Sequence, residues 1–264
     1  MSRTIVLVTG ANRGIGKGIL QIYLNKPDHL VVAANRDPSH PTSQALSDLP
    51  MAEGTTLEII QLDALSPTDP ANAVKELAVK RITHIDILIA NAGIAISWPK
   101  VIDVTTEDIQ KHVDVNIYGF VRLYQAFRAV LKKAKAPKWV TIGSSSAFFT
   151  FPFPIIPRSL YLADHTPSRN FIPMQNASYA PTKAVQHWYT KAISVEDPWL
   201  NAFPVDPGWV QTDIGNRGAD AFGFEKAAVT VEDSAAGVVK VIDGSTLETH
   251  SGKIFKFGGE EVAW

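Results

Sequence analysis

The sequence of 264 residues contains no cysteine, which excludes disulfide bonds, thiolate nucleophiles and zinc sites built on thiolates. It also lacks excess charge: the formal net charge is −1, so neither nucleic acid nor an anionic membrane surface is indicated as a partner. No apolar run approaches the roughly 20 residues of a membrane span, and the first apolar run starts too early to leave room for a signal peptide. We therefore expect a cytoplasmic protein that acts on a small molecule and holds no metal.

Apolar runs alternate with helical patterns along the whole chain, which is typical of a parallel sheet flanked by helices. The length allows one large α/β domain spanning residues 1–264. Helical spacing after Gly16 and over four later segments predicts helices, namely 70–81, 106–135, 179–193 and 231–242. Seven segments are predicted to be strands, namely 5–8, 30–34, 57–62, 85–90, 139–142, 200–205 and 253–257.

A glycine-rich turn links the first predicted strand to the first predicted helix. Residues 9–16 read Thr-Gly-Ala-Asn-Arg-Gly-Ile-Gly. Glycines permit positive φ and close approach to the backbone, and the N–H groups of a helix N-terminus attract anions. The turn is either a tight βα connection without a ligand or a pyrophosphate site, and its strand and helix context favours the site. The residues expected to bind a dinucleotide here are Gly10, Asn12, Arg13, Gly14, Ile15 and Gly16.

The end of the second predicted strand indicates which dinucleotide is bound. In such folds an acidic residue there bonds the 2′-hydroxyl of NAD, whereas an arginine accommodates the 2′-phosphate of NADP. The chain has Asn35 and Arg36 at this place, and Arg13 in the glycine turn adds a second cation. These residues favour NADP(H), although Asp37 follows directly and keeps the NAD alternative open.

Three motifs together carry a resemblance to a known family. The glycines of the turn are spaced Gly-x-x-x-Gly-x-Gly, Asn91 is followed by Ala-Gly after the fourth predicted strand, and Tyr179 precedes Lys183 by four positions. In combination these motifs resemble the short-chain dehydrogenase/reductase family. The resemblance covers essentially the full length and implies a Rossmann-type, doubly wound, mainly parallel seven-stranded sheet. It also implies an oxidoreductase with a nicotinamide cofactor, and dimers or tetramers are common in the family.

The resemblance implies a catalytic set of four residues. Tyr179 is expected to act as the general acid, and Lys183, which shares its helix face, lowers the pKa of the phenol and holds the nicotinamide ribose. Ser144, at the end of the fifth predicted strand, hydrogen-bonds the substrate oxygen, with Ser145 as the rival assignment. Asn116 interrupts an apolar helix face, so it either satisfies backbone groups at a kink or holds a water near the lysine.

Further cofactor contacts are implied at the ends of other strands. Asp63 is expected to meet the adenine ring or to cap the following turn, and both roles are compatible. The family usually has two asparagines before Ala-Gly, but here Ala90 takes the first place and only Asn91 remains to tie the sheet to the cofactor. After the sixth strand a Pro-Gly turn resembles the one beside the nicotinamide, with contacts expected from Pro207, Gly208, Val210 and Thr212.

Two segments depart from a minimal fold of this family. The interval between Ser144 and Tyr179 is much longer than is usual in the family, with a Pro-rich and aromatic-rich insertion near 148–175. Such a long, apolar loop is expected either to fold over the substrate cleft or to cover an outer helix. Residues 213–228, rich in glycine and phenylalanine, are expected to form a mobile lid.

The C-terminal half narrows the resemblance to a fungal group of the family, the norsolorinic acid ketoreductases. It rests on residues 199–203, 206–213 and the final Val-Ala-Trp, 262–264. This implies an NADPH-dependent reduction of a ketone on an aromatic polyketide in secondary metabolism. A broad-specificity carbonyl reductase is the enzymatic alternative. A non-catalytic NADP-sensing protein is the other, and it is disfavoured because such proteins tend to lose the tyrosine or the lysine, both present here.

Overall fold

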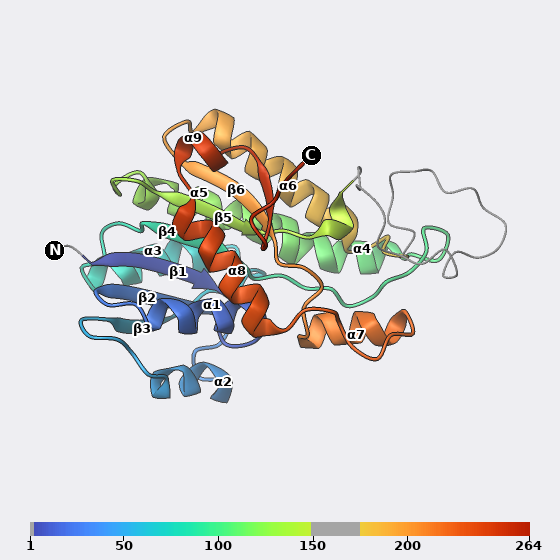
Figure 1. The fold of residues 1–264 in the computed structure, drawn as a ribbon, viewed down its shortest axis with the longest axis horizontal. Helices are drawn as coiled ribbons and strands as arrows, with labels where there is room; N and C mark the ends of the chain where they lie inside the picture. The colour runs from blue at the N-terminus through green and yellow to red at the C-terminus, as the bar shows by residue number, and fades with distance from the viewer. Residues whose placement is uncertain (1–2, 149–174) are drawn as a thin grey trace.

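The computed structural model describes residues 3–148 and 175–264, and these form a single eight-stranded sheet with helices on both faces (Figure 1). The strand order is β3-β2-β1-β4-β5-β6-β7-β8, and every pair is parallel except β7 with β8. The strands are β1 Thr4–Thr9, β2 His29–Asn35, β3 Thr56–Gln61, β4 Ile87–Ala90, β5 Lys138–Ile142, β6 Asn201–Asp206, β7 Ile254–Lys256 and β8 Glu261–Val262. The Rossmann-type fold is therefore confirmed.

The helices divide between the two faces of the sheet. The described helical segments are α1 Gly14–Leu24, α2 Pro41–Gln44, η1 Ala45–Asp48, α3 Asp69–Val79, α4 Thr106–Val113, η2 Asp114–Gly119, α5 Phe120–Leu131, η3 Ser145–Ala147, α6 Ala180–Glu196, α7 Asp213–Ala221, α8 Val231–Gly244 and α9 Leu247–His250. Helices α1 and α8 pack on one face, and α3, α5 and α6 pack on the other. Figure 1 shows α7 beyond the sheet, on the side away from the N-terminus.

Alternation along the strands feeds two separate cores. On β1, Val6 and Val8 are buried against α1 and α8, whereas Ile5 and Leu7 are buried against the opposite helices. Successive side chains of a strand point to opposite faces, so a strand covered on both sides must be apolar throughout. Burial of both faces holds the central strands in register and fixes where their carboxyl ends lie.

The structure differs from the sequence-based expectation in two places. The sheet has eight strands instead of seven, because the chain turns back after β7 and adds β8 as a short antiparallel edge. The helix expected over 106–135 is not one regular α-helix: a π-helical turn, η2, separates α4 from α5. Such turns arise when one residue more than the α-helical number fits into a turn, and they are frequent at functional sites.

The strand order reverses between β1 and its two neighbours, β2 and β4, whose connections run to opposite faces of the sheet. In open α/β sheets ligands bind outside the carboxyl ends of the strands at such a point. The glycine turn follows β1 here, Asn91 follows β4, and Ser144 lies two residues beyond β5.

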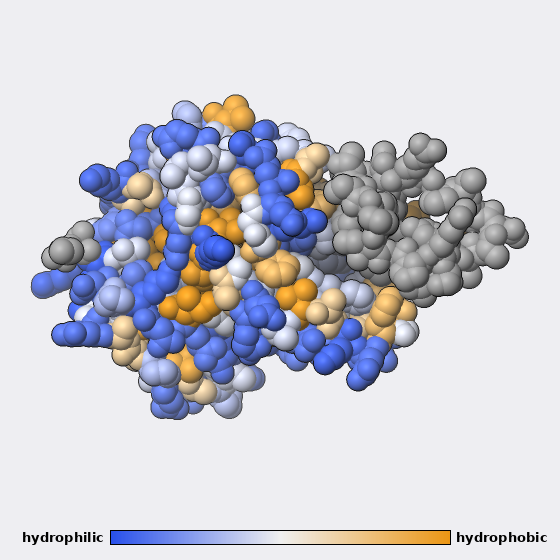
Figure 2. Space-filling model, in the orientation of Figure 1, coloured by the Kyte–Doolittle hydropathy of each residue, from blue (hydrophilic) through white to orange (hydrophobic). Residues whose placement is uncertain are grey.

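The outer surface is mainly polar where it can be seen. Figure 2 shows a largely hydrophilic face, with apolar groups gathered toward its centre. Over the described residues, no helix is both long enough and apolar enough to cross a membrane. The insertion expected near 148–175 lies almost wholly outside the described residues.

Candidate active site

The glycine turn has the backbone geometry expected of an anion cradle. Gly10 and Gly14 adopt positive φ values of 63° and 54°, which side chains disfavour. A Cβ atom at Gly16 would lie 2.4 Å from the Gly10 carbonyl oxygen and 2.5 Å from the Asn91 side-chain nitrogen. Only glycine fits at this position without displacing the backbone. Helix α1 begins at Gly14, so its N-terminus faces the same turn.

Polar side chains at the neighbouring strand ends hold this turn in place. The Asn91 amide donates to the carbonyl oxygens of Thr9 and Gly10 at 2.8 and 3.2 Å. The Thr9 hydroxyl accepts the N–H groups of Asn91 and Ala92, both at 3.0 Å. Asn35 is fully buried and accepts the Ala11 N–H at 2.9 Å, so it braces the turn from β2. The single Asn91 thus ties the sheet to the turn.

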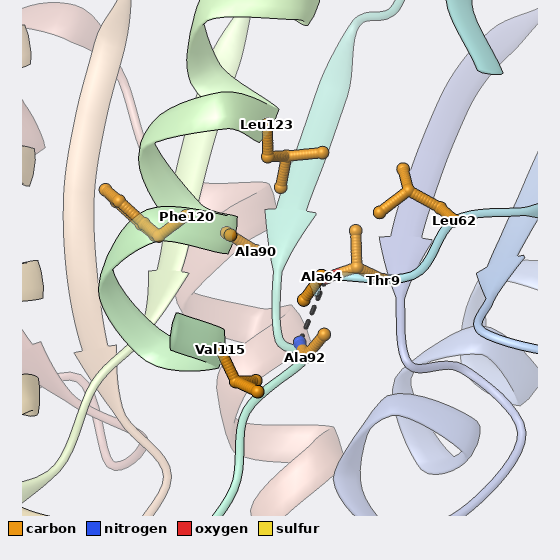
Figure 3. Close-up of a pocket in the computed structure, with 9 residues that line it drawn as sticks. Thr9, Leu62, Ala64, Ala90, Ala92, Val115, Phe120 and Leu123 are labelled. Carbon is orange, nitrogen blue, oxygen red and sulfur yellow. Dashed lines mark hydrogen bonds between the residues drawn. The ribbon is translucent and has the colours of Figure 1, made fainter. Parts of the chain in front are cut away.

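A small cavity lies beside the turn, and Ala90 is one of the residues that line it. It has a volume of about 20 Å³, and its lining is almost entirely apolar. Figure 3 shows Ala90 and Leu62 on its wall, next to the hydrogen bond between Thr9 and Ala92. That volume is enough for about one water molecule. Ala90 stands where the family pattern has an asparagine, so a side chain without an amide lines this cavity.

The two charged residues that follow β2, Arg36 and Asp37, make different contacts. Arg36 is exposed and lines the cleft. Asp37 accepts both the N–H and the hydroxyl of Ser39, at 2.8 and 2.6 Å, and these hydrogen bonds lower the pKa of its carboxyl group. The Asp37 carboxylate therefore stabilises the turn to which Asp37 belongs. Arg13 forms an ion pair with Asp213, the first residue of α7, at 2.8 Å.

Asp63 follows β3 and closes the turn that leads toward α3. Its carboxylate accepts the Leu65 N–H at 3.0 Å, and its own N–H donates to Asp69 at 3.0 Å. The capping role considered from the sequence is therefore present. Asp63 also lines the cleft, so the capping role and the expected contact with adenine remain compatible.

The serine, tyrosine and lysine converge where β5 meets the start of α6. Ser144 and Tyr179 share a side-chain hydrogen bond, and the Lys183 ammonium group donates to the Ile142 carbonyl oxygen at 2.8 Å. Burial raises the pKa of Tyr179 to about 12, against the lowering effect of the Ser144 bond. The lowering expected from Lys183 is therefore not found, because burial of the phenol has the largest effect. Burial lowers the pKa of Lys183 to about 8. The phenol is thus protonated at neutral pH, beside a lysine that gives up its proton more readily than usual.

The two candidate serines point in different directions. Ser144 meets Tyr179, and its hydroxyl lies 2.7 Å from that of Ser146. Ser145 hydrogen-bonds the carboxyl group of Asp206 through both its N–H and its hydroxyl. Asp206 is buried at the end of β6, and this burial raises its pKa. The structure therefore brings Ser144, and not Ser145, to the tyrosine.

Asn116 lies in the π-helical turn η2 and is fully buried. Its side chain bonds both the N–H and the carbonyl group of Ile94, each at 2.9 Å, and donates to the Thr182 hydroxyl at 3.0 Å. A Cβ atom at Gly93 would lie 3.2 Å from the Asn116 carbonyl oxygen and 3.8 Å from the Lys183 nitrogen. Asn116 therefore satisfies backbone groups, and it approaches Lys183 across this glycine without a direct hydrogen bond between them.

The Pro-Gly turn after β6 leads into α7. Gly208 has a φ of 79°, and its N–H donates to Asp206 at 3.2 Å. Thr212 caps α7 by accepting the Gly215 N–H at 3.1 Å. Val210 forms an isolated bridge with Val229, which closes the segment between them into a loop carrying α7. This loop includes residues 213–228, which are expected to form the lid.

One cleft of about 1190 Å³ joins these parts. Of the residues expected from the sequence to be catalytic or to bind the cofactor, those lining it are Gly10, Asn12, Arg13, Gly14, Ile15, Gly16, Arg36, Asp63, Asn91, Ser144, Tyr179, Lys183, Pro207, Gly208, Val210 and Thr212. Asn116 lies behind the wall. The cleft is large enough for a dinucleotide together with a second ligand.

Four aromatic rings on the cleft wall were not expected from the sequence as a group. Trp98 meets Phe222 edge to face at 6.3 Å between ring centroids, and Trp209 meets Phe222 and Phe224 at 6.4 and 5.3 Å. They come from the loop after β4, the Pro-Gly turn and the end of α7. Trp209 belongs to the Pro-Gly motif, and Phe222 and Phe224 belong to the segment expected to form a lid. No local signal identifies Trp98, and only the tertiary fold brings the four rings together.

Comparison with known proteins identifies the family. The model of the family described as short chain dehydrogenase matches residues 4–156, more than half of the chain. The chain therefore belongs to the short-chain dehydrogenase/reductase family, whose members use nicotinamide cofactors.

Full-length relatives agree with this assignment. A norsolorinic acid ketoreductase of Dothistroma septosporum is 36% identical, with 99% of this chain and 93% of that protein covered. A short-chain dehydrogenase of Neurospora crassa is also 36% identical, with 99% and 98% covered. The crystal structure of an NADPH-bound carbonyl reductase from chicken fatty liver matches with a TM-score of 0.79 at 27% identity, and 100% of both chains is covered. The resemblance to ketoreductases of this family is thereby confirmed.

Proposed function

We propose that the protein is an NADPH-dependent ketoreductase that reduces a ketone on an aromatic, polyketide-like substrate in secondary metabolism. The observation that carries the proposal is the convergence of Ser144, Tyr179 and Lys183 in the same cleft as the glycine turn. Reduction of a carbonyl group needs a proton donor next to a site for the hydride carrier, and the cleft offers both.

The cleft fits a nicotinamide dinucleotide. The glycine turn leaves its backbone open to a pyrophosphate, since a Cβ atom at Gly16 would collide with the turn itself. When bound, the nicotinamide supplies the hydride. Lys183 and Tyr179 would hold its ribose, and Asp63 would meet the adenine ring. The remaining contacts would come from Gly10, Asn12, Arg13, Gly14, Ile15, Arg36, Asn91, Pro207, Gly208, Val210 and Thr212.

The proton for the reduction would come from the chain's own residues. The carbonyl carbon accepts the hydride while the carbonyl oxygen takes the hydroxyl proton of Tyr179, which yields the alcohol. Ser144 hydrogen-bonds the same oxygen and stabilises its developing negative charge. The charge of Lys183 stabilises the phenolate that remains. Asn116 would assist through a water molecule, by which the lysine recovers its proton.

Two cations support NADP over NAD. Arg36 is exposed at the end of β2, and no hydrogen bond or ion pair to another described residue engages it. Arg13 lies in the glycine turn and lines the cleft together with its partner Asp213, and both side chains are exposed. Asp37 accepts both Ser39 hydrogen bonds on one carboxylate oxygen and also lines the cleft, so its other oxygen keeps the NAD alternative open. The chicken carbonyl reductase is an NADPH-bound protein, which agrees with this preference.

The aromatic rings support a flat, aromatic substrate. Trp98, Trp209, Phe222 and Phe224 offer ring faces and edges at the end of the cleft formed by α7 and the loop after β4. Relatives at 35–37% identity are norsolorinic acid ketoreductases by name. We further propose that residues 213–228, which include α7, act as a lid over this substrate.

A broad-specificity carbonyl reductase is the second candidate. It is favoured by the full-length structural match to the chicken carbonyl reductase. A non-catalytic NADP-sensing protein fits less well, because Tyr179 and Lys183 are both present and lie together. The two enzymatic proposals share one chemistry and differ in the substrates accepted.

The test is turnover of aromatic polyketide ketones, quinones and simple aldehydes, followed by NADPH and NADH absorbance. The proposal predicts turnover of a narrow set of aromatic ketones with NADPH at least about tenfold more efficient than with NADH. Trp98→Ala should raise KM for those ketones, whereas Trp188→Ala, an exposed tryptophan outside the cleft, should not. Equal turnover of all carbonyl classes would favour the broad reductase, and NADPH binding without any turnover would favour the sensor.

A further inference from the structure

His187 is a buried titratable side chain that the proposed mechanism does not use. It lies on α6 one helical turn after Lys183, and only 4% of it is exposed. Its Nε2 atom accepts the backbone N–H of Ser144 at 3.3 Å. A Cβ atom at Gly143 would lie 2.5 Å from the same Nε2 atom, so the imidazole reaches Ser144 because residue 143 is glycine.

The imidazole is held neutral in this setting. Burial and the nearby charge of Lys183 lower the pKa of His187 to about 3. A neutral imidazole has one donor and one acceptor nitrogen. Because Nε2 faces an N–H group, Nε2 must be the acceptor and Nδ1 carries the proton. The acceptor is therefore available to Ser144 at every pH at which the protein is expected to work.

Two side chains of helix α6 form hydrogen bonds with the backbone at the end of β5. Lys183 donates to the carbonyl oxygen of Ile142, and His187 accepts from the N–H of Ser144. These are the backbone groups on either side of Gly143, a residue without a side chain to restrict it. Phe148 packs on the imidazole at 5.8 Å between ring centroids. The two bonds together fix where the strand ends and where the Ser144 side chain begins.

We propose that His187 is a positioning residue that holds Ser144 in register with Tyr179. The proposal rests on the proposed function in one respect, since it takes the Ser144 hydroxyl to hydrogen-bond the substrate oxygen. The backbone bond from His187 sets the Ser144 main chain, and the main chain sets the direction of the hydroxyl. Without the imidazole acceptor, the Ser144 N–H is left without a partner at the strand end and the serine is free to turn.

Three substitutions separate the acceptor from the bulk of the side chain. His187→Leu keeps an apolar side chain of similar size and removes the acceptor. His187→Gln places an amide oxygen near the position of Nε2, whereas His187→Asn reaches only the position of Nδ1. We expect kcat to fall about 10- to 100-fold in H187L and H187N, because a misplacement of about 1 Å can cost that much. H187Q should recover most of the rate, and NADPH affinity should change less than about twofold in all three.

A double-mutant cycle with Ser144→Ala tests whether His187 acts through the serine. In the S144A background H187L should lower kcat less than about twofold, because no hydroxyl remains to be positioned. Equal losses in both backgrounds would overturn the proposal, as would an H187Q variant no better than H187N. If H187L fails to fold, the Gln and Asn pair carries the same comparison.

A readout independent of activity keeps this proposal separate from the proposed function. Hydrogen exchange of the Ser144 amide, followed by NMR, should be at least about tenfold faster in H187N than in the wild type, with H187Q close to wild type. Unchanged exchange in H187N would overturn the positioning role even if the enzyme is a ketoreductase. Faster exchange in a protein that reduces no carbonyl would retain the positioning role and remove the proposed function.

Discussion

Burial where β5 meets α6 shifts the pKa values of Tyr179 and Lys183 in opposite directions. Burial raises the pKa of Tyr179 to about 12, which keeps the phenol protonated as an acid must be. Burial also lowers the pKa of Lys183 to about 8, which lets it exchange its proton near neutral pH. Tyr179 therefore keeps the proton that it is expected to donate, whereas Lys183 loses its positive charge within the accessible pH range.

This difference predicts a break in the pH profile of carbonyl reduction. Below pH 8 Lys183 is charged and stabilises the phenolate that forms in the reaction; as the pH rises above 8 this charge is lost and the rate falls. We expect kcat/KM for NADPH, which reports ionisations of the free enzyme, to be level from pH 6 to about 8 and then to fall up to tenfold per pH unit.

Lys183→Arg is the matched control for that profile, because an arginine does not lose its charge in this range. Its absolute rate should be lower, and its profile should stay level to pH 10. A wild-type profile without a break between pH 7 and 9 would contradict the assigned role of Lys183.

At the residue scale the sequence predicted which residue types lie at the strand ends but not which way they point. Ser144 and Ser145 could not be separated, because their directions depend on Tyr179 and Asp206, both distant in sequence. The sequence predicts that Arg13 faces a phosphate, but no local signal indicates its ion pair with Asp213, 200 positions later. His187 carried no local signal, since its partner is a backbone N–H group.

At the scale of elements, the glycine turn and the start of α7 touch each other. The Arg13 and Asp213 side chains form an ion pair at 2.8 Å, and they are 64% and 66% exposed. A Cβ atom at Gly14 would lie 3.1 Å from a methyl carbon of Thr212, the cap of α7. Exposed ion pairs contribute little to stability. The pair therefore matters mainly through the charges that it places beside the glycine turn, where we propose that the pyrophosphate binds.

Asp213→Asn is predicted to tighten NADPH binding. Asp213 forms an ion pair with Arg13 and places a negative charge beside the guanidinium group that we propose binds the 2′-phosphate, so replacing Asp213 would free that group for the phosphate. We expect the Kd of NADPH to fall about two- to fivefold at low ionic strength and the Kd of NADH to stay unchanged.

Fluorescence titration of both cofactors at low and at high salt would measure this difference. The gain for NADPH should shrink at high salt, because exposed charges are then screened. An equal change for the two cofactors would show that Arg13 does not read the 2′-phosphate.

The elements themselves were largely predictable. Hydrophobic periodicity placed the seven main strands to within two residues at either end, because strands buried on both faces are apolar throughout. The π-helical turn at Asp114–Gly119 was not predictable, since one residue more per turn leaves the apolar spacing of α4 and α5 almost unchanged. Strand β8 has only two residues, too few for any periodic pattern.

At the scale of the whole molecule, the sheet gathers into one cleft residues that are far apart in the chain. The ends of β1, β4, β5 and β6 supply the glycine turn, Asn91, Ser144 and Asp206. Each motif alone has a structural explanation, and only the strand order brings them to the same edge. Fold does not decide function, so the proposed activity depends on the chemistry of the residues at that edge.

The Tyr179→Phe variant tests the central claim most directly, because it removes one hydroxyl group and keeps the ring. Single-turnover oxidation of bound NADPH by an aromatic ketone should slow about 10²- to 10⁴-fold, the usual range for loss of a general acid. The Kd of NADPH should rise by no more than about tenfold, the cost of one lost hydrogen bond to the ribose. Tyr189→Phe removes a hydroxyl from the same helix outside the cleft and should leave the rate unchanged. If Y179F instead reduces the ketone at more than about a tenth of the wild-type rate, Tyr179 is not the proton donor and the proposed mechanism is wrong.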